Sequence, residues 1–145
     1  MVLDVEQMLR PVAEKVRSIR AARDRRWFVD CPVQYVVPVC RFLFEQVRLR
    51  FVISTGVDAE GCFEVLHHFC HDGSGSFVTV RVCIPDRSDP HLDSIAPFMP
   101  TAEWIEREIQ DLLGIRFDGH PNPKRLILAD DWPEGVYPLR KDFKP

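Results

Sequence analysis

Residues 76–85, SFVTVRVCIP, constrain the fold most because a branched aliphatic residue occupies every second position from Val78 to Ile84. Such a period of two places the apolar groups on one face of a β-strand. The segment 62–72, CFEVLHHFCHD, precedes it, and Gly73 and Gly75 between the two are typical of a hairpin turn. A hairpin is therefore predicted, and the alternation in its second strand gives that strand one apolar face. Its clearest inward-facing residues are Val78, Val80, Val82 and Ile84.

The N-terminal half supplies further elements around this hairpin. Apolar residues at helical spacing predict an amphipathic helix over residues 3–22, in which Pro11 is a kink or a fresh first turn. Residues 25–31, RRWFVDC, and 50–61, RFVISTGVDAEG, favour strands. The length and apolar density of residues 32–48 favour a buried helix.

The C-terminal half begins with a polar, proline-punctuated loop at 86–100. A helix is predicted over residues 102–113, capped by Thr101 and ended by Gly114. The order of elements predicts an α+β fold, a single domain with a mainly antiparallel sheet of about four strands and helices packed on one face. We expect this domain to cover residues 1–129, followed by an irregular, extended C-terminal docking tail at 130–145.

Composition excludes several classes of protein. The chain has 145 residues and a net charge of −3, so no global charge favours nucleic acid or an anionic membrane. No apolar run approaches the about 18 residues that span a bilayer, and the acidic, amphipathic N-terminus is unlike a secretory signal. Five cysteines without a CxxC pair predict reduced core thiols. These features predict a cytoplasmic chain, or one peripheral to a cytosolic assembly.

The histidines of HHFCHD are the most obvious candidates for a metal site. In a strand, His67 and His71 share one face but lie about 13 Å apart. One zinc ion cannot bind both, since zinc–nitrogen bonds are about 2.0–2.1 Å long. His68 and Cys70 share the other face and would need ligands from elsewhere. A core or sheet-face role is favoured, and a stand-alone metal or acid–base enzyme using these histidines is kept as an alternative.

Residues 15–26 form a basic run that suggests a second alternative, a nucleic-acid-binding module. Glu14 and Asp24 interrupt the positive charge, and no interleaved aromatic residues support base stacking. A solvated helix face, or a salt-bridge seam to a partner, is the favoured interpretation.

The predicted helix 102–113 is rich in charge but lacks a catalytic pattern. Glu108 and Asp111 are helical neighbours, and Arg107 is four residues from both Glu103 and Asp111, so local ion pairs account for much of the charge. No nucleophile or glycine loop lies nearby to complete an acid–base site. The apolar stripe that should face the core is Ile105, Ile109, Leu112 and Leu113.

Residues 94–143 carry a dense set of matches to one family. The matching residues are Glu106-Arg107-Glu108, Asp111, His120, Lys124 and Leu126-Ile127. Trp104 lies before them, the segment GIRFDGHP lies among them, and the segment PLRKDF lies after them. In these residues the chain resembles the 30 kDa subunit of respiratory complex I, the NADH dehydrogenase. Related subunits occur in energy-converting (group 4) nickel–iron hydrogenases and formate hydrogenlyases. The sequence of residues 130–143, DDWPEGVYPLRKDF, resembles these hydrogenase relatives more than the respiratory form.

The resemblance implies a hydrophilic subunit without active site, flavin, iron–sulfur cluster or metal. It implies a partner, the large (49 kDa-like or hydrogenase large) subunit, beside other hydrophilic subunits at the cytoplasmic face of the inner membrane. It implies no nucleic acid and no membrane span. A charged helix followed by an aromatic, basic tail suits docking. The predicted docking residues are Trp104, Glu106, Arg107, Glu108, Asp111, His120, Lys124, Trp132, Tyr137, Leu139, Arg140, Lys141, Asp142 and Phe143.

Overall fold

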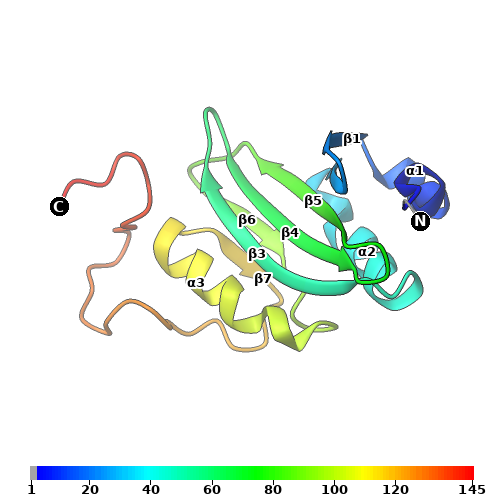
Figure 1. Cartoon of the computed structure of the whole chain (residues 1–145). Helices are drawn as coiled ribbons and strands as arrows, with labels where there is room; N and C mark the ends of the chain where they lie inside the picture. Colours follow the sequence, from blue (N-terminus) through cyan, green and yellow to red (C-terminus); the bar gives the residue numbers. More distant parts are fainter. Residues whose placement is uncertain (1–2) are drawn as a thin grey trace.

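A mixed five-stranded sheet is the centre of the computed structural model, which describes residues 3–145 (Figure 1). The strands are β1 (Ser18–Arg23), β2 (Arg26–Asp30), β3 (Arg50–Asp58), β4 (Phe63–His71) and β5 (Ser76–Ile84). Their order in the sheet is β1-β2-β5-β4-β3. All neighbours are antiparallel except β2 and β5, which are parallel. The predicted α+β class is confirmed, with five strands in this sheet rather than about four.

The predicted hairpin is β4–β5, and its apolar face forms the core. The residue pairs across it include Phe63 with Ile84 and Val65 with Val82. Val78, Val80 and Val82 are fully buried. The period-two pattern therefore identified both the strand and the face that it buries.

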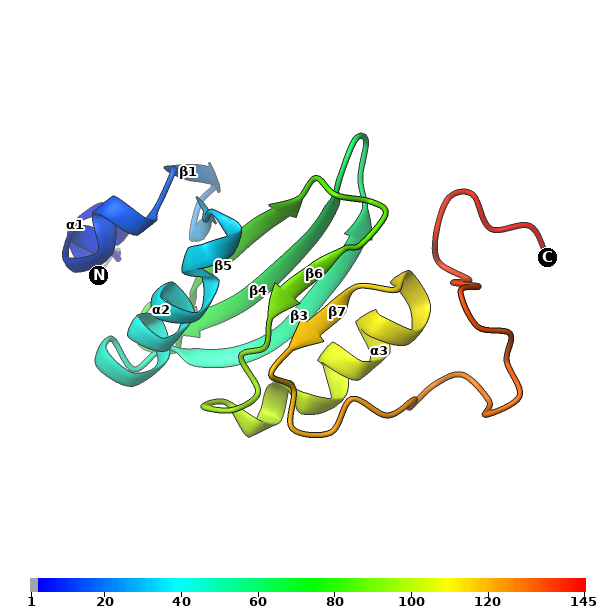
Figure 2. The same ribbon diagram turned by 180° about the vertical axis from the view of Figure 1, so that it is seen from behind.

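The helical segments are short apart from one. They are α1 (Val5–Leu9), η1 (Arg10–Lys15), η2 (Val33–Tyr35), α2 (Val36–Arg41), η3 (Phe42–Gln46), η4 (Pro100–Ala102) and α3 (Glu103–Leu113). Figure 2 shows α2 and α3 on the same face of the sheet. The helix predicted over 32–48 is confirmed in outline, as three consecutive segments of which the last is π-helical. No helix within residues 3–145 has the length and hydropathy to cross a membrane.

The predicted helix 3–22 is wrong beyond Lys15. Val16 has an extended backbone (φ −114°, ψ 132°), and Ser18–Arg23 pairs with β2 as strand β1. The Ser18 hydroxyl also donates to Asp30, 2.6 Å away. Arginine and alanine are good helix formers, but helix propensity amounts to less than about 1 kcal/mol per residue and tertiary context overrides it. Pairing with β2 therefore decides the conformation. The basic run at 15–26 consequently begins at the end of η1 and continues along β1 to the start of β2, so it does not form one helix face.

The loop at 86–100 holds a strand that was not predicted. β6 (His91–Asp93) pairs in parallel with β7 (Arg116–Asp118). Thr101 is not the cap of α3, because a 3₁₀ turn precedes the helix and places Ala102, which has no capping side chain, at the N-cap. Gly114 does end the helix as predicted, with φ +71° in the left-handed region.

Candidate functional site

Glu106, on the inner side of α3, is fully buried. Its carboxyl group accepts hydrogen bonds from the Ser94 hydroxyl and from the Ile95 N–H, the latter 2.8 Å away. Burial raises the pKa of Glu106 to about 7, although these two hydrogen bonds act in the opposite direction. The residue therefore fastens the turn after β6 to α3 from inside the domain.

His120 fastens the next bend to the same helix. Its Nε2 donates to the Glu103 carbonyl at 2.9 Å, and its Nδ1 accepts from the Asn122 N–H at 3.0 Å. Nε2 also lies 3.8 Å from a Glu106 carboxyl oxygen. A ring nitrogen that accepts an N–H bond carries no proton, so the imidazole is neutral in this arrangement. Glu106 and His120 thus join the turn after β6 and the bend at 120–122 to α3.

Arg107 and Asp111 bind the backbone of the segment that runs back along α3. Arg107 donates to the carbonyls of Lys124 (2.7 Å) and Arg125 (2.9 Å). One oxygen of Asp111, Oδ2, accepts from three consecutive N–H groups, those of residues 126–128. The ion pairs predicted between Arg107 and its helical neighbours are absent from the described chain. Backbone groups of an irregular segment need partners, and these side chains supply them.

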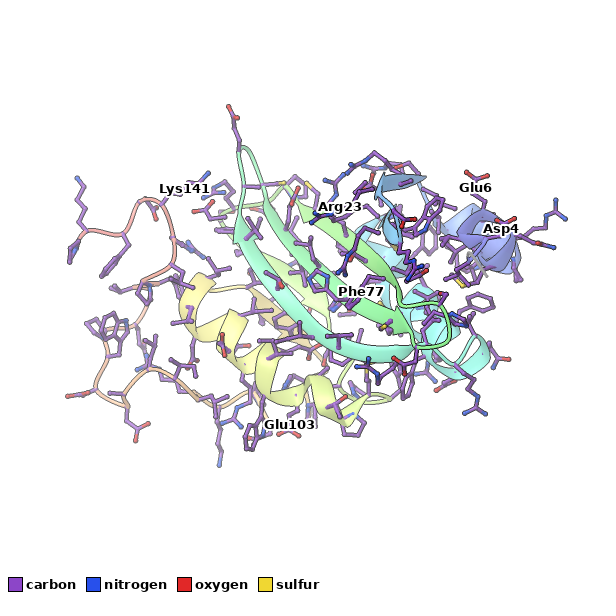
Figure 3. All side chains as sticks on the ribbon, in the orientation of Figure 1. Asp4, Glu6, Arg23, Phe77, Glu103 and Lys141 are labelled. Atoms are coloured by element: carbon purple, nitrogen blue, oxygen red, sulfur yellow. The ribbon has the colours of Figure 1, made fainter. Side chains whose placement is uncertain are left out.

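The tail after residue 130 is attached by further internal bonds. The Leu139 N–H donates to the Leu112 carbonyl (3.0 Å), and Arg140 Nε donates to the Leu113 carbonyl (2.7 Å). The Lys141 N–H donates to Asp58 at the end of β3 (2.9 Å), and Figure 3 labels Lys141 on this part of the tail. The C-terminal segment therefore returns to the sheet that the first half of the chain builds.

Gly114 makes room for this return. A Cβ at this position would lie 2.5 Å from the Tyr137 ring and 2.6 Å from the Arg140 guanidinium. Its positive φ also disfavours any other residue. Asp58 and Arg87, which pair at 2.8 Å beneath the tail, were not among the predicted residues. No sequence signal could have found them, since Asp58 is 83 residues from Lys141.

The predicted docking residues divide by their exposure. Glu106 and Asp111 are buried, so any effect that they have on a partner passes through the segments they hold. Trp104 and Leu139 are strongly exposed, at 69% and 59%. Lys124, Lys141 and Asp142 are also exposed, whereas Arg107, Glu108, His120, Trp132, Tyr137, Arg140 and Phe143 are intermediate.

The histidines of β4 are bonded within the sheet. His67 is fully buried, with Nδ1 2.7 Å from the Ser54 hydroxyl, and His68 lies between Thr55 and Thr79. Residues 3–145 contain no group of three side chains arranged to hold a metal ion. All five cysteines are free, and four are buried as predicted, but Cys83 is exposed because it faces away from the core.

Two arginines of the basic run lie against aromatic rings. Arg26 lies 3.9 Å above the Phe77 ring, and Arg20 lies 5.1 Å from the Phe28 ring. Figure 3 shows Arg23 and Phe77 near each other on this side of the sheet. Guanidinium groups therefore compete with any base for the rings of Phe28 and Phe77.

Comparison with known proteins identifies the family. The family model of the respiratory-chain NADH dehydrogenase 30 Kd subunit matches residues 29–145. The chain belongs to this family. The resemblance seen in residues 94–143 is confirmed, and the match extends back to β2.

Named relatives come from two kinds of complex. A subunit of the NADH-quinone oxidoreductase of Nocardioides sp. is 38% identical over 74% of this chain and 45% of that protein. Formate hydrogenlyase subunit 5 of Escherichia coli K12 is 46% identical over 79% of this chain and 21% of that protein. The chain thus spans less than half the length of these two relatives.

Solved structures share the fold. A chain of the archaeal membrane-bound sulfane sulfur reductase, a respiratory membrane complex, matches with a TM-score of 0.80 at 28% identity, over 97% of this chain and 83% of that one. A trypsin-resistant fragment of Nqo5 matches with a TM-score of 0.69 at 25% identity, over 83% of this chain and 99% of the fragment. The family's relatives therefore include subunits of several membrane-associated respiratory complexes.

The buried carboxyl group predicts a pH effect. Because the pKa of Glu106 rises from 4.5 to about 7 on folding, its contribution to stability is largest below pH 4.5 and is lost as pH rises to 7. The stability of wild type relative to Glu106→Gln should therefore fall by on the order of 3 kcal/mol between these limits. Urea unfolding of both proteins from pH 4.5 to 8 measures it. A pH-independent difference would contradict the raised pKa.

Proposed function

We propose that the chain is a non-catalytic, hydrophilic subunit of a membrane-associated energy-converting redox complex. The complex is of the NADH:quinone oxidoreductase type or of the related nickel–iron hydrogenase type. In it the chain docks on the large catalytic subunit and supports it, peripherally on the cytoplasmic face. Membership of the 30 Kd subunit family and the names of its relatives support this proposal.

The observation that carries the docking proposal is the construction of the C-terminal segment. Residues 119–145 form no helix or strand, yet side chains of α3 and β3 hold their backbone at many points. Large apolar groups meanwhile point outward, among them Leu139 and, on α3 itself, Trp104. A held, irregular segment with exposed apolar anchors presents a preformed surface, which lowers the entropy lost on binding.

Charges on the tail add specificity to these anchors. Arg140, Lys141 and Asp142 place both signs beside Leu139 and Phe143. When such a group forms a partly desolvated ion pair with a partner, truncating one member of the pair typically lowers the binding free energy by about 2–5 kcal/mol. The side chains that fasten the signature segments are engaged with this chain's own backbone, which supports a structural role for them.

Deletion of residues 130–145 tests the proposal. No residue after Phe117 belongs to the buried apolar core of the described chain, so the shortened domain should still fold, with a slightly lower melting temperature. Assembly with the large subunit should fail or weaken strongly, because the anchors and the charges of the tail are lost. The measurement is co-purification of the tagged, shortened chain with its large subunit, together with a thermal melt of the chain alone.

Point variants separate the surface from its support. Leu139→Ser should weaken co-purification without lowering the melting temperature, since Leu139 is 59% exposed. Arg23→Ser, an exposed position on β1 far from the tail, is the control and should leave assembly unchanged. Unchanged co-purification of both the deletion and Leu139→Ser would refute docking through the tail.

A further inference from the structure

A shallow groove runs between β3 and α3. Two adjacent hollows of about 500 and 300 Å³ form it, and both are lined by Ile53, Ile105 and Glu108. Six of the seven exposed large apolar residues among residues 3–145 line these hollows. They are Val52, Ile53, Trp104, Leu126, Ile127 and Leu139. An apolar concentration of this kind on one side of a small domain marks a contact surface.

Glu108 is the single charged residue among those that line the groove. Within the described chain it forms neither an ion pair nor a side-chain hydrogen bond, unlike Arg107 and Asp111 on the same helix. A carboxylate that an apolar partner covers without compensation is costly. The occupant must therefore bring a basic group to this point.

The wall of the groove opposite α3 is an edge strand. β3 is last in the order of the sheet and pairs with β4 alone. Apart from this pairing, the backbone of residues 50–57 makes no hydrogen bond to another backbone group within residues 3–145. The free edge of β3 therefore offers N–H and C=O groups to an incoming strand, while Val52 and Ile53 beside it offer apolar contacts.

We propose that this groove receives an extended, apolar segment of the large subunit, which adds a strand to β3 and places a lysine or arginine opposite Glu108. The inference rests on the proposed function and adds a second contact, which adjoins that of the tail at Leu139. A helix in the groove would cover the edge of β3 without satisfying its backbone groups. A second copy of this chain would bring no basic side chain from its own groove to neutralise Glu108.

Two valines on β3 give a matched pair of variants. Val52 and Val57 are 39% and 38% exposed, but only Val52 lines the groove. Val52→Asp should weaken the affinity for the large subunit by about tenfold or more, because it adds an uncompensated carboxylate to the contact. Val57→Asp should have a much smaller effect, because its side chain lies outside the groove. Thermal melts of both chains confirm that each is folded.

Amide hydrogen exchange distinguishes an added strand from other contacts. In the complex, amides of residues 51–57 that point away from β4 should exchange at least about tenfold more slowly than in the isolated chain. Unchanged exchange of these amides in a complex that forms would overturn the proposal, as would equal effects of the two valine variants. Dimers of the isolated chain that Val52→Asp dissociates, seen by light scattering, would assign the groove to a second copy instead.

The outcomes also separate this inference from the proposed function. If the wild-type chain does not bind the large subunit at all, the proposed function fails. If the wild-type chain binds but Val52→Asp binds equally well, docking stands and the groove is not part of it.

Discussion

Replacing Asp111 with alanine is expected to free residues 126–128 from α3 and to lower the free energy of unfolding by about 3 kcal/mol or more. The three N–H groups of this segment share one acceptor, Asp111 Oδ2, at 2.8 to 3.2 Å. Each bond has a charged acceptor, and Asp111 is only 6% exposed, so water replaces the acceptor poorly. The amides of residues 126–128 should consequently lose their protection from hydrogen exchange.

The asparagine variant is the matched control for this effect. Asp111→Asn keeps an oxygen that can occupy the position of Oδ2, so it should retain most of the stability and the amide protection. Urea unfolding gives the free energies, and exchange followed by mass spectrometry locates the loss. Equal losses in Asp111→Asn and Asp111→Ala would show that the charge matters rather than the shared acceptor. Negligible loss in both would show that the segment does not depend on Asp111.

His67 is expected to make the protein sensitive to acid. Burial lowers the pKa of His67 from 6.5 to about 3, because a charged imidazole loses its hydration inside the core. Below pH 6.5 His67 binds a proton in the unfolded chain, whereas in the folded chain it does so only near pH 3. The contribution of His67 to the free energy of unfolding is therefore complete above pH 6.5, and it falls by up to about 1.4 kcal/mol per pH unit towards pH 3.

The variant His67→Asn isolates this effect, since asparagine can still accept from the Ser54 hydroxyl. The stability of wild type minus that of His67→Asn should decline as the pH falls from 6 to 4. Both proteins contain Glu106, whose opposite pH dependence cancels in the difference. The control is His71→Asn, at the half-buried end of β4. Its stability minus that of His67→Asn should decline over the same pH range as it does for the wild type. A flat difference between wild type and His67→Asn would contradict burial of a neutral His67.

The sheet was more predictable from the sequence than the segments around it. Alternation in residues 76–85 and Gly114 as a helix end reflect local rules, which act whatever the rest of the chain does. β1 is different, because its conformation depends on pairing with β2 and its side chains are mostly exposed. β6 has three residues and becomes a strand only beside β7, which lies more than twenty residues later.

The signature residues could be located from the sequence, but their contacts could not. The spacing correctly places Arg107 and Asp111 on one helix, but it also predicts an ion pair between them that the structure does not contain. The backbone of an irregular segment competes for the same groups, and that segment has no pattern that reveals its path. The groove could not be located from the sequence either, since β3 becomes an edge strand only once the order of the sheet is established.

Oxidative footprinting of the isolated chain and of its complex with the large subunit tests the central claim most directly. Trp104 and Leu139, which are 69% and 59% exposed in the isolated chain, should lose most of their labelling by hydroxyl radicals on assembly. Phe28 on β2 and Phe77 on β5, which alternate with the buried Val29 and Val78 and so face away from the core, should keep theirs. Unchanged labelling of Trp104 and Leu139 in an assembled complex, with loss at Phe28 and Phe77, would contradict docking through α3, the groove and the tail.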